Sequence, residues 1–412
     1  MLSPVASINS LLLAVAILLL GTGYLGTLLG LRVAMEGFST LVSGIILSGF
    51  FFGYVIGTYL IPRMILYAGF IRTFSALAAI ASAAVILHGL LVEPVTWWLL
   101  RTITGICMVG MYMVIESWLN EQSHHARRGR VFAVYMTVNL LALAASQYLI
   151  LVYSPESLAS FALVAIFISL ALVPVALTPL TAPVPTRLTE FSLGKLFTVS
   201  PLGASAALAS GFGNGAFWAL GPVFGQYVGM TPGNIAIFMS VVIFAGALSQ
   251  WPIGYLSDSW DRRKVLMLAS FAGGGAGVLA YYFSMVSVPG LIGLAAIYGI
   301  FSFSVYSLAV AHTNDHLDRT ETLATTRGLL LLNGIGATVG PIIAGLLMSF
   351  FGARSFLLYL GVILVFLGFY AVYRIMVSSP IAAEEKMEFM PMARTSLVAA
   401  ELDPRTDQEE SR

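Results

Sequence analysis

The chain alternates between continuous apolar blocks and short polar connections. Each block holds about twenty residues, which is enough to cross a bilayer core of roughly 30 Å as a helix. Lipid offers no partners to backbone N–H and C=O groups, so such blocks must be helical. They lack the alternation in polarity that membrane β-strands require. The expected spans are 8–31, 41–62, 73–92, 95–118, 131–152, 158–178, 200–224, 233–253, 265–287, 290–312, 327–350 and 355–377.

Composition supports a membrane protein and excludes a soluble fold. Of the 412 residues, 58% are hydrophobic and 9% are charged, whereas an average soluble domain carries roughly 25% charged residues. The net charge of +1 and the absence of a basic cluster give no reason to expect a nucleic-acid partner. The single cysteine, Cys107, excludes an intrachain disulfide. No Lys or Arg precedes the first block, so we interpret it as a retained span rather than a signal peptide.

The distribution of basic residues predicts the orientation. With twelve spans both termini lie on one side, and if that side is the cytoplasm only Arg32 and Arg354 fall in the opposite connections. The positive-inside rule therefore predicts that both termini are cytoplasmic, in the inner (plasma) membrane. The twelve basic residues of the cytoplasmic connections are then Arg63, Arg72, Arg127, Arg128, Arg130, Arg187, Lys195, Arg262, Arg263, Lys264, Arg319 and Arg327.

The two halves of the chain resemble each other when the second is shifted by 194 residues. Without a gap, this register pairs glycine, tyrosine, asparagine and acidic positions of spans 4–5 with those of spans 10–11. The matched pairs are Gly105 and Gly299, Tyr112 and Tyr306, Asn120 and Asn314, Glu121 and Asp315, and Asn139 and Asn333. We expect an all-α membrane fold of two pseudo-symmetric six-helix bundles, with the substrate site between the halves.

This duplication predicts four regions. They are an N-terminal bundle over 1–180, a cytoplasmic linker over 181–198, a C-terminal bundle over 199–378 and a tail over 379–412. The tail is polar, acidic in patches and contains Pro380, Pro391 and Pro404. That composition favours a disordered cytoplasmic extension, to which we assign no function.

The connection after span 8 reads Gly-Tyr-Leu-Ser-Asp-Ser-Trp-Asp-Arg-Arg-Lys over 254–264. It resembles the signature loop of the major facilitator superfamily, a Gly-x-Leu-x-Asp followed by a basic cluster. Physically, Gly254 permits close helix approach, Asp258 caps or pairs near a helix end, and Arg262 and Arg263 hold the cytoplasmic face. The equivalent connection in the first half, 57–72, has no carboxylate. A symmetric pair of charge latches is therefore not expected.

Other segments extend the resemblance. Arg-Thr-Ile-Thr-Gly over 101–105 is similar to the arginine motif of the superfamily's fourth span. Val-Ile-Glu-Ser-Trp over 114–118, the segment 128–136 and Gln-Trp-Pro-Ile-Gly over 250–254 resemble the bacterial YcaD-type branch. Span 5 lacks the Gly-Pro motif of the family's antiporters; a similar motif lies instead at 336–345. The resemblance covers about 8–375 and implies a transporter that works as a monomer in the lipid bilayer.

Two charges fall inside span 4, where burying a charge costs several kcal/mol. Arg101 is a candidate for binding an anion or coupling a proton in the central cavity, or else a structural arginine. Glu116 lies near the cytoplasmic end among Glu121, Arg127, Arg128 and Arg130. Its alternatives are a gating network, which we favour, and a proton carrier.

Uncharged polar and aromatic side chains supply further cavity candidates. A solute could bind them through hydrogen bonds or stacking; otherwise they join helices, at about 0.6 kcal/mol per contact. These candidates are Tyr112, Asn139, Asn214, Trp218, Tyr298, Tyr306 and Asn333.

The function that best fits is secondary active transport of a small organic solute, coupled to an ion such as a proton. No phosphate-binding loop is present, so direct use of ATP is not expected. Neither a cofactor nor a metal site is indicated. Efflux of drugs or toxic compounds is the alternative within the fold. A membrane sensor is a remote alternative, as is an enzyme built on His312, Asn314, Asp315, His316 and Asp318.

Overall fold

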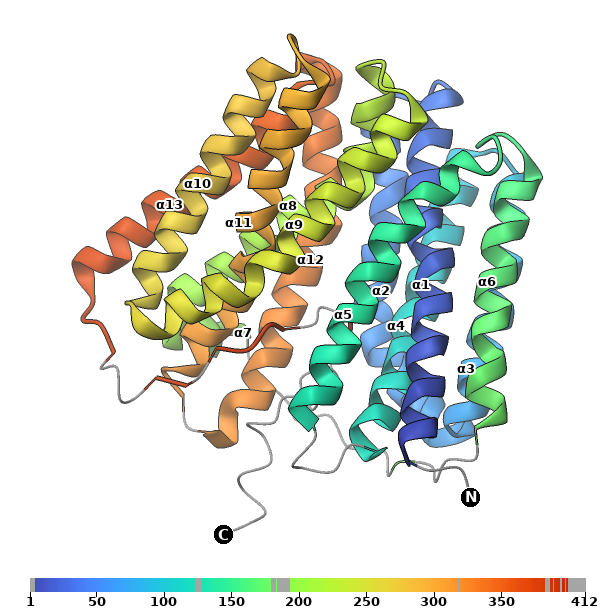
Figure 1. Cartoon of the computed structure of the whole chain (residues 1–412), viewed down its shortest axis with the longest axis horizontal. Helices are drawn as coiled ribbons and strands as arrows, with labels where there is room; N and C mark the ends of the chain where they lie inside the picture. The colour runs from blue at the N-terminus through green and yellow to red at the C-terminus, as the bar shows by residue number, and fades with distance from the viewer. Residues whose placement is uncertain are drawn as a thin grey trace. The chain divides into compact units, whose positions relative to one another are not determined.

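The computed structural model describes residues 4–122, 128–178, 183, 193–317, 319–381, 386, 387, 389–392, 395, 396 and 398. Over these residues the chain is helical, as expected, and Figure 1 shows the long helices running beside one another within each half. The elements are α1 (Pro4–Met35), α2 (Thr40–Ala68), α3 (Phe70–Leu90), α4 (Pro94–Gln122), α5 (Arg128–Ser146), the 3₁₀ turn η2 (Gln147–Leu151), α6 (Leu158–Leu177), α7 (Leu193–Val199), α8 (Pro201–Tyr227), α9 (Pro232–Ser259), α10 (Arg262–Phe283), α11 (Val288–Asn314), α12 (Arg319–Phe351) and α13 (Ser355–Val377).

Eleven helices in the described part of the chain are long and apolar enough to cross a membrane. The one expected span without a counterpart among these eleven is the seventh, 200–224. It corresponds to α8, which has 27 residues. Its many Gly, Ala and Ser residues and Asn214 lower its mean hydropathy without shortening it. The helix α12 begins at Arg319 rather than at 327, so Arg327 lies inside a helix and is buried there.

Helix starts follow from local sequence. The side chains of Ser157, Ser200, Thr231, Asp261 and Ser287 accept hydrogen bonds from backbone N–H groups of the first turns of α6, α8, α9, α10 and α11. These N–H groups have no partner within the helix, so the caps satisfy them. Between α2 and α3, Gly69 has φ of +81°, a left-handed conformation that glycine adopts without a steric penalty. This residue allows α3 to begin immediately after α2.

Contacts divide the chain into two compact units. Unit 1 takes the described residues of 1–32, 49–189 and 393–412, and unit 2 takes those of 33–48 and 190–392. The segment 33–48 joins α1 to α2 and packs with the C-terminal helices: Thr40 Oγ1 donates to the Gly345 carbonyl at 2.9 Å, and Tyr227 Oη donates to the Phe38 carbonyl at 3.1 Å. Each unit therefore contains chain from both halves of the sequence.

Glycines bring helices into backbone contact in both units. In unit 1, a Cβ at Gly105 of α4 would overlap the Phe50 carbonyl of α2, and a Cβ at Gly53 would overlap the Thr102 carbonyl. In unit 2, a Cβ at Gly299 of α11 would overlap the Val242 carbonyl of α9. Such close approach is typical of membrane helices joined through small residues. The two glycines that the 194-residue register pairs thus have the same packing role.

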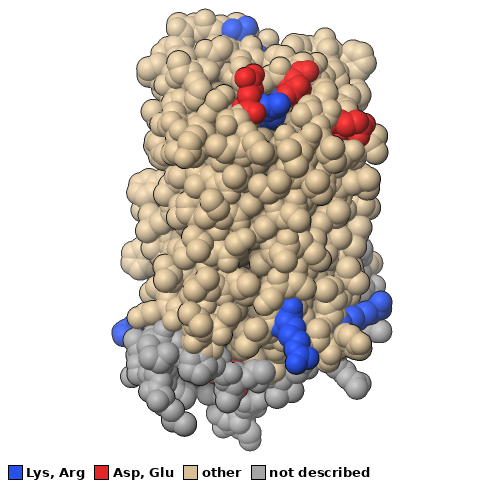
Figure 2. Space-filling model, turned by 90° about the vertical axis from the view of Figure 1, so that its right-hand side faces the viewer, with Lys and Arg blue, Asp and Glu red and all other residues tan. Residues whose placement is uncertain are grey.

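Large apolar side chains point outward as well as inward. Trp251, Leu177 and Phe366 are 83%, 75% and 70% exposed, respectively. On the face drawn in Figure 2, charged side chains lie toward the two ends, and a broad band between them carries none. Exposed apolar surface with charges at its borders is the pattern that a lipid environment accepts.

Candidate functional site

A buried carboxylate marks the polar centre of unit 1. Glu116, on α4, is 0% exposed. Its Oε1 accepts hydrogen bonds from the hydroxyls of Tyr135, on α5, and Thr395, and its Oε2 accepts one from Ser396. A buried charge needs such donors, because burying it without them costs several kcal/mol. Two of the three donors come from the C-terminal tail.

Two tyrosines contact Thr395, and a third is close to Glu116 in sequence. Tyr54 of α2 donates its hydroxyl hydrogen bond to the backbone carbonyl of Thr395, and Tyr135 Oη lies 3.4 Å from Thr395 Oγ1. Tyr112 is buried on α4 one turn before Glu116. Three helices, α2, α4 and α5, therefore place polar atoms around one dipeptide, which is itself buried at Ser396 (1% exposed).

The remaining candidates of unit 1 are separated from this centre or make local bonds. Arg101 is buried, with its guanidinium carbon 4.7 Å from the ring centroid of Phe50, a cation–π contact. Asn139 Nδ2 donates to the Tyr135 carbonyl on its own helix at 2.8 Å. Arg130 is exposed. Arg127, expected in a gating network with Glu116, lies outside the described residues.

In unit 2, the polar candidates line neighbouring helices. Asn214 Nδ2 donates to Ser210 Oγ at 2.9 Å, and Asn214 Oδ1 accepts from Ser302 Oγ at 3.4 Å, which links α8 to α11. Trp218 packs edge-on against Phe303, with ring centroids 6.2 Å apart. The amide of Asn333 donates across to the Ala207 carbonyl at 3.1 Å, unlike its counterpart Asn139.

Tyr298 and Tyr306 share α11 with Ser302 and are both buried. The phenol oxygen of Tyr298 would lie 3.1 Å from a Cβ added at Gly213, so this tyrosine faces α8. Asn214, Trp218 and Tyr298 thus lie where α8 and α11 meet, whereas Asn333 contacts α8 from α12.

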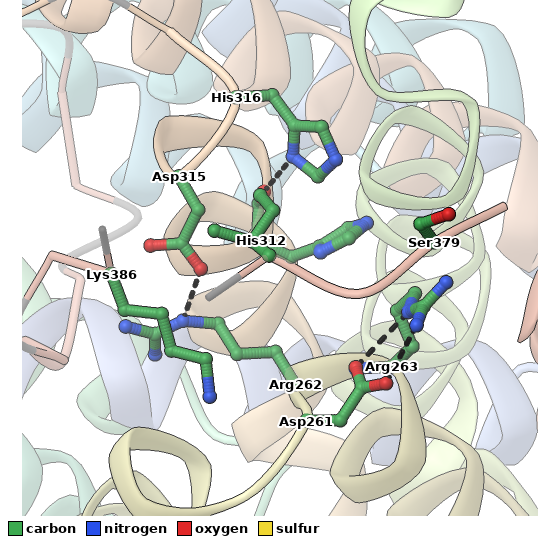
Figure 3. Close-up of a pocket in the computed structure, with 9 residues that line it drawn as sticks. Asp261, Arg262, Arg263, His312, Asp315, His316, Ser379 and Lys386 are labelled. Atoms are coloured by element: carbon green, nitrogen blue, oxygen red, sulfur yellow. Dashed lines mark hydrogen bonds and ion pairs between the residues drawn. The ribbon is translucent and has the colours of Figure 1, made fainter. Parts of the chain in front are cut away.

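The signature segment 254–264 covers the end of α9 and the start of α10, and its charged residues form a network of ion pairs (Figure 3). Arg262 is 2% exposed; its Nε donates to Asp315 Oδ2 at 2.6 Å, and its Nη1 donates to Ser257 Oγ at 2.9 Å. Its Nη2 lies 3.1 Å from Asp258 Oδ1. Arg263 pairs with Asp261 at 2.7 Å, and its Nη1 donates to the Ser378 carbonyl at 2.7 Å. Asp258 thus lies one residue before the end of α9 and pairs with the first residue of α10.

Tail residues cover this network. The Met387 N–H donates to Asp315 Oδ1 at 3.0 Å, and the Met387 carbonyl accepts from Arg262. The Phe389 N–H donates to both oxygens of Asp258, at 2.9 and 3.1 Å, while its ring occupies the space that a side chain at Gly254 would need. The glycine of the signature loop therefore accommodates the phenylalanine of the tail.

Two further bonds extend the tail contact in unit 2. Lys386 Nζ donates to the Trp260 carbonyl at 2.6 Å, and the Met392 N–H donates to Ser307 Oγ at 3.1 Å. Phe389 and Met392 are 8% and 4% exposed. These residues belong to the tail for which the sequence predicts disorder, yet they are bound along α9 and α11.

Two carboxyls of the network have shifted pKa values in opposite directions. Burial raises the pKa of Asp315, and the charge of Arg262 with the hydrogen bond from Met387 only partly opposes that rise. Burial also acts to raise the pKa of Asp261, but hydrogen bonds from Arg263 outweigh it, so this pKa lies below its ordinary value. Burial therefore dominates the pKa of Asp315, and the hydrogen bonds from Arg263 together outweigh burial in the pKa of Asp261.

The polar cluster from His312 to Asp318, considered above for an enzyme, makes separate contacts in the structure. Asp315 is engaged by Arg262 and Met387, while His316 Nδ1 lies 2.8 Å from the His312 carbonyl. The two histidine rings meet edge to face, with centroids 4.7 Å apart. Asp318 lies outside the described residues. Among the described residues no group of His, Cys, Asp and Glu could hold a metal ion.

Sequence reasoning did not identify Tyr54, Tyr135, Thr395 and Ser396 as partners of Glu116. Tyr135 is visible in the segment 128–136 as a tyrosine in an apolar span, but the tail hydroxyls carry no periodic or motif signal. Thr395 and Ser396 follow Glu116 by 279 and 280 positions, and only the fold brings them to its carboxylate.

Comparisons with known proteins agree with this helical architecture. Residues 203–399 match the family model of the Major Facilitator Superfamily. The "Uncharacterized MFS-type transporter YcaD" of Escherichia coli O17:K52:H18 is 27% identical over 343 residues, 83% of this chain and 88% of that protein. The YcaD of Escherichia fergusonii is 26% identical over 341 residues, or 82% and 88%. Over most of its length this chain is therefore similar to transporters of the major facilitator superfamily.

Solved structures show the same fold at low identity. The nucleoside transporter NupG has a TM-score of 0.73 and 12% identity, covering 90% of this chain and all of that one. A bacterial homologue of the human lysosomal transporter Spinster, inward-facing and unoccupied, has a TM-score of 0.73 and 13% identity, covering 93% and 98%. This chain thus has the fold of these transporters, resembles YcaD in sequence and contains several helices long and apolar enough to cross a membrane.

Proposed function

We propose that this protein is a secondary active transporter of the major facilitator type that moves a small organic solute across the inner membrane by alternating access, coupled to protons. The observation that carries the proposal is Glu116, a carboxyl with 0% exposure inside a helix long and apolar enough to span the membrane. Ionisable side chains in such positions are costly and mark transport or proton pathways. A carboxyl that exchanges its hydrogen-bond donors for a proton can link solute movement to a pH gradient.

The proposed arrangement places both termini in the cytoplasm and moves the bundles 1–180 and 199–378 around a cavity. The excess of basic residues in one set of connections supports this orientation. The shared packing of Gly105 and Gly299 supports two related bundles. The linker 181–198 would join them, and the transporter would work as a monomer.

The solute would bind to the polar candidates that the sequence supplies. Arg101 and Tyr112 would contribute from α4, Asn139 from α5 and Asn333 from α12. The remaining four, on α8 and α11, are Asn214, Trp218, Tyr298 and Tyr306. Export of weakly polar or amphipathic compounds is the second candidate, and the ring contacts among Phe217, Trp218 and Phe303 favour it.

We expect Glu116→Gln to abolish gradient-driven accumulation while leaving the protein folded. Glutamine keeps the size and can still accept hydrogen bonds from Tyr135, but it neither carries the charge nor binds and releases a proton at neutral pH. The measurement is solute accumulation by vesicles containing the purified protein, given a metabolite and toxin mixture, with and without an imposed pH gradient. Wild-type accumulation should collapse when the gradient is dissipated.

Glu93→Gln is the matched control, since Glu93 is an exposed carboxyl just before the same helix, where it accepts from the Val95 and Thr96 N–H groups. It should transport like the wild type. Accumulation that survives Glu116→Gln would restrict Glu116 to a structural role. Solute fluxes equal to those of empty vesicles under every ion gradient would contradict transport itself.

A further inference from the structure

The two tail residues at Glu116 form a pair of neighbouring hydroxyl donors. Thr395 Oγ1 donates to Oε1 of the carboxylate and Ser396 Oγ donates to Oε2, so each oxygen receives one bond from the pair. A carboxylate accepts two parallel hydrogen bonds from any group that holds two donors side by side. The bonds come from side chains of adjacent residues, and a small molecule could present the same two donors on adjacent carbon atoms.

The surroundings of the pair have the features of a binding site. Tyr135 Oη donates to the same oxygen as Thr395, and Tyr54 holds the Thr395 backbone carbonyl. Tyr112, buried one turn before Glu116, adds a third phenol near the carboxylate. Few polar atoms in fixed positions among aromatic walls are typical of small-molecule sites.

Thr395 and Ser396 belong to a segment that lies outside the long helices. The described tail residues before them are bound to unit 2 by the contacts of Met387, Phe389 and Met392. When this segment leaves Glu116, the carboxylate loses two donors and must gain others, because leaving it buried and unsatisfied is costly.

We propose that Glu116 and the tyrosines around it form a binding site for an uncharged solute with two adjacent hydroxyl groups, such as a sugar or polyol, and that Thr395 and Ser396 occupy this site as a tethered competitor. The inference rests on the proposed transport function, of which it names the solute class. The tail lowers the apparent affinity for solute by the fraction of molecules in which it occupies the site.

The test uses the full-length purified protein and two readouts, equilibrium binding and vesicle uptake. The probes are D-ribose and D-glucose, each compared with its 2,3-dideoxy counterpart, whose ring form has no two adjacent hydroxyl groups, and agmatine as a cationic probe that also presents two donors. The variants are Thr395→Ala/Ser396→Ala, which removes both tail hydroxyls, and Thr395→Ser/Ser396→Thr, which exchanges the residues and keeps both hydroxyls.

We expect the double alanine variant to bind a sugar about tenfold more tightly or better, as for a competitor that occupies the site nine-tenths of the time. The exchanged variant should bind like the wild type. The 2,3-dideoxy sugars should bind about ten- to a hundredfold more weakly, since no adjacent pair of hydroxyls remains and at least one donor to a charged acceptor is missing. Glu116→Gln should remove most of this discrimination.

Three results would overturn the proposal: equal affinity in the double alanine variant and the wild type, equal binding of sugars and their deoxy counterparts, or binding of agmatine with no binding of the sugars. Uptake of some other solute alongside any of these would leave transport intact and reject only the diol site. Sugar binding that follows the expected order without any uptake would instead reject transport and retain the site.

Discussion

Arg262→Ala is expected to lower the free energy of unfolding by about 3–5 kcal/mol, the cost of removing one partner of a buried ion pair. Arg262 and the side chain of Asp315 are each 2% exposed, and their contact is 2.6 Å. Without the guanidinium, burial raises the pKa of Asp315 without the opposing effect of Arg262. The Met387 carbonyl and Ser257 lose their donor in the same substitution. Unfolding of the detergent-purified protein by denaturant measures the change.

Lys264→Ala provides the control in the same loop, because Lys264 is exposed two residues beyond Arg262. Its effect should stay within about 0.5 kcal/mol. Arg262→Lys keeps the charge but not the planar set of donors, so we expect an intermediate loss. Equal stability of the Arg262→Ala and Lys264→Ala proteins would mean that the network does not stabilise the fold.

Gly105→Ala is expected to destabilise unit 1 by about 1–3 kcal/mol, the usual cost of adding a methyl group where none fits. The new Cβ would overlap the Phe50 carbonyl, and backbone cannot move aside as a flexible side chain can. The α2–α4 contact would have to widen, which also changes the surroundings of Arg101 above the Phe50 ring. The denaturant midpoint of the purified variant measures the loss.

Gly26→Ala is the matched comparison, since nothing lies within 4 Å of a Cβ added at that residue of α1. Alanine there gains helix propensity of up to about 1 kcal/mol, so this variant should be as stable as the wild type or more so. Gly299→Ala should behave like Gly105→Ala because it meets the Val242 carbonyl. A Gly105→Ala protein as stable as Gly26→Ala would contradict the tight α2–α4 contact.

The long helices could be predicted because hydrophobicity alone determines them. The blocks at 355–377 and 73–92 coincide closely with α13 (Ser355–Val377) and α3 (Phe70–Leu90). Boundaries at polar ends were less accurate: α12 begins eight residues before the expected span because polar residues also continue a helix. The short helix α7 (Leu193–Val199) falls in the expected linker, where no apolar block predicted a helix.

The site was predictable only where its chemistry is local in sequence. Asp258 and Arg262 are only four residues apart, at the end of α9 and the start of α10, and their pairing is local in sequence. Arg262 also donates a hydrogen bond to Asp315, which lies 53 residues away in the sequence. That distance along the chain gave no reason to expect the pair. For Glu116, neighbouring loop charges favoured a gating network, whereas the described contacts are hydroxyls of α5 and the tail. A composition that suggests disorder gives no information about where a segment can bind.

The tail contact also bears on the order in which the contacts of this face can form during synthesis. Lys386, Met387 and Phe389 follow α13 in the chain, so a ribosome makes them after α9, α10 and α11, on which they lie. Each newly made molecule therefore inserts these helices with Asp258 and Asp315 still lacking the backbone donors that later cover them. The Arg262–Asp315 pair can therefore form before the tail residues that cover it have been made.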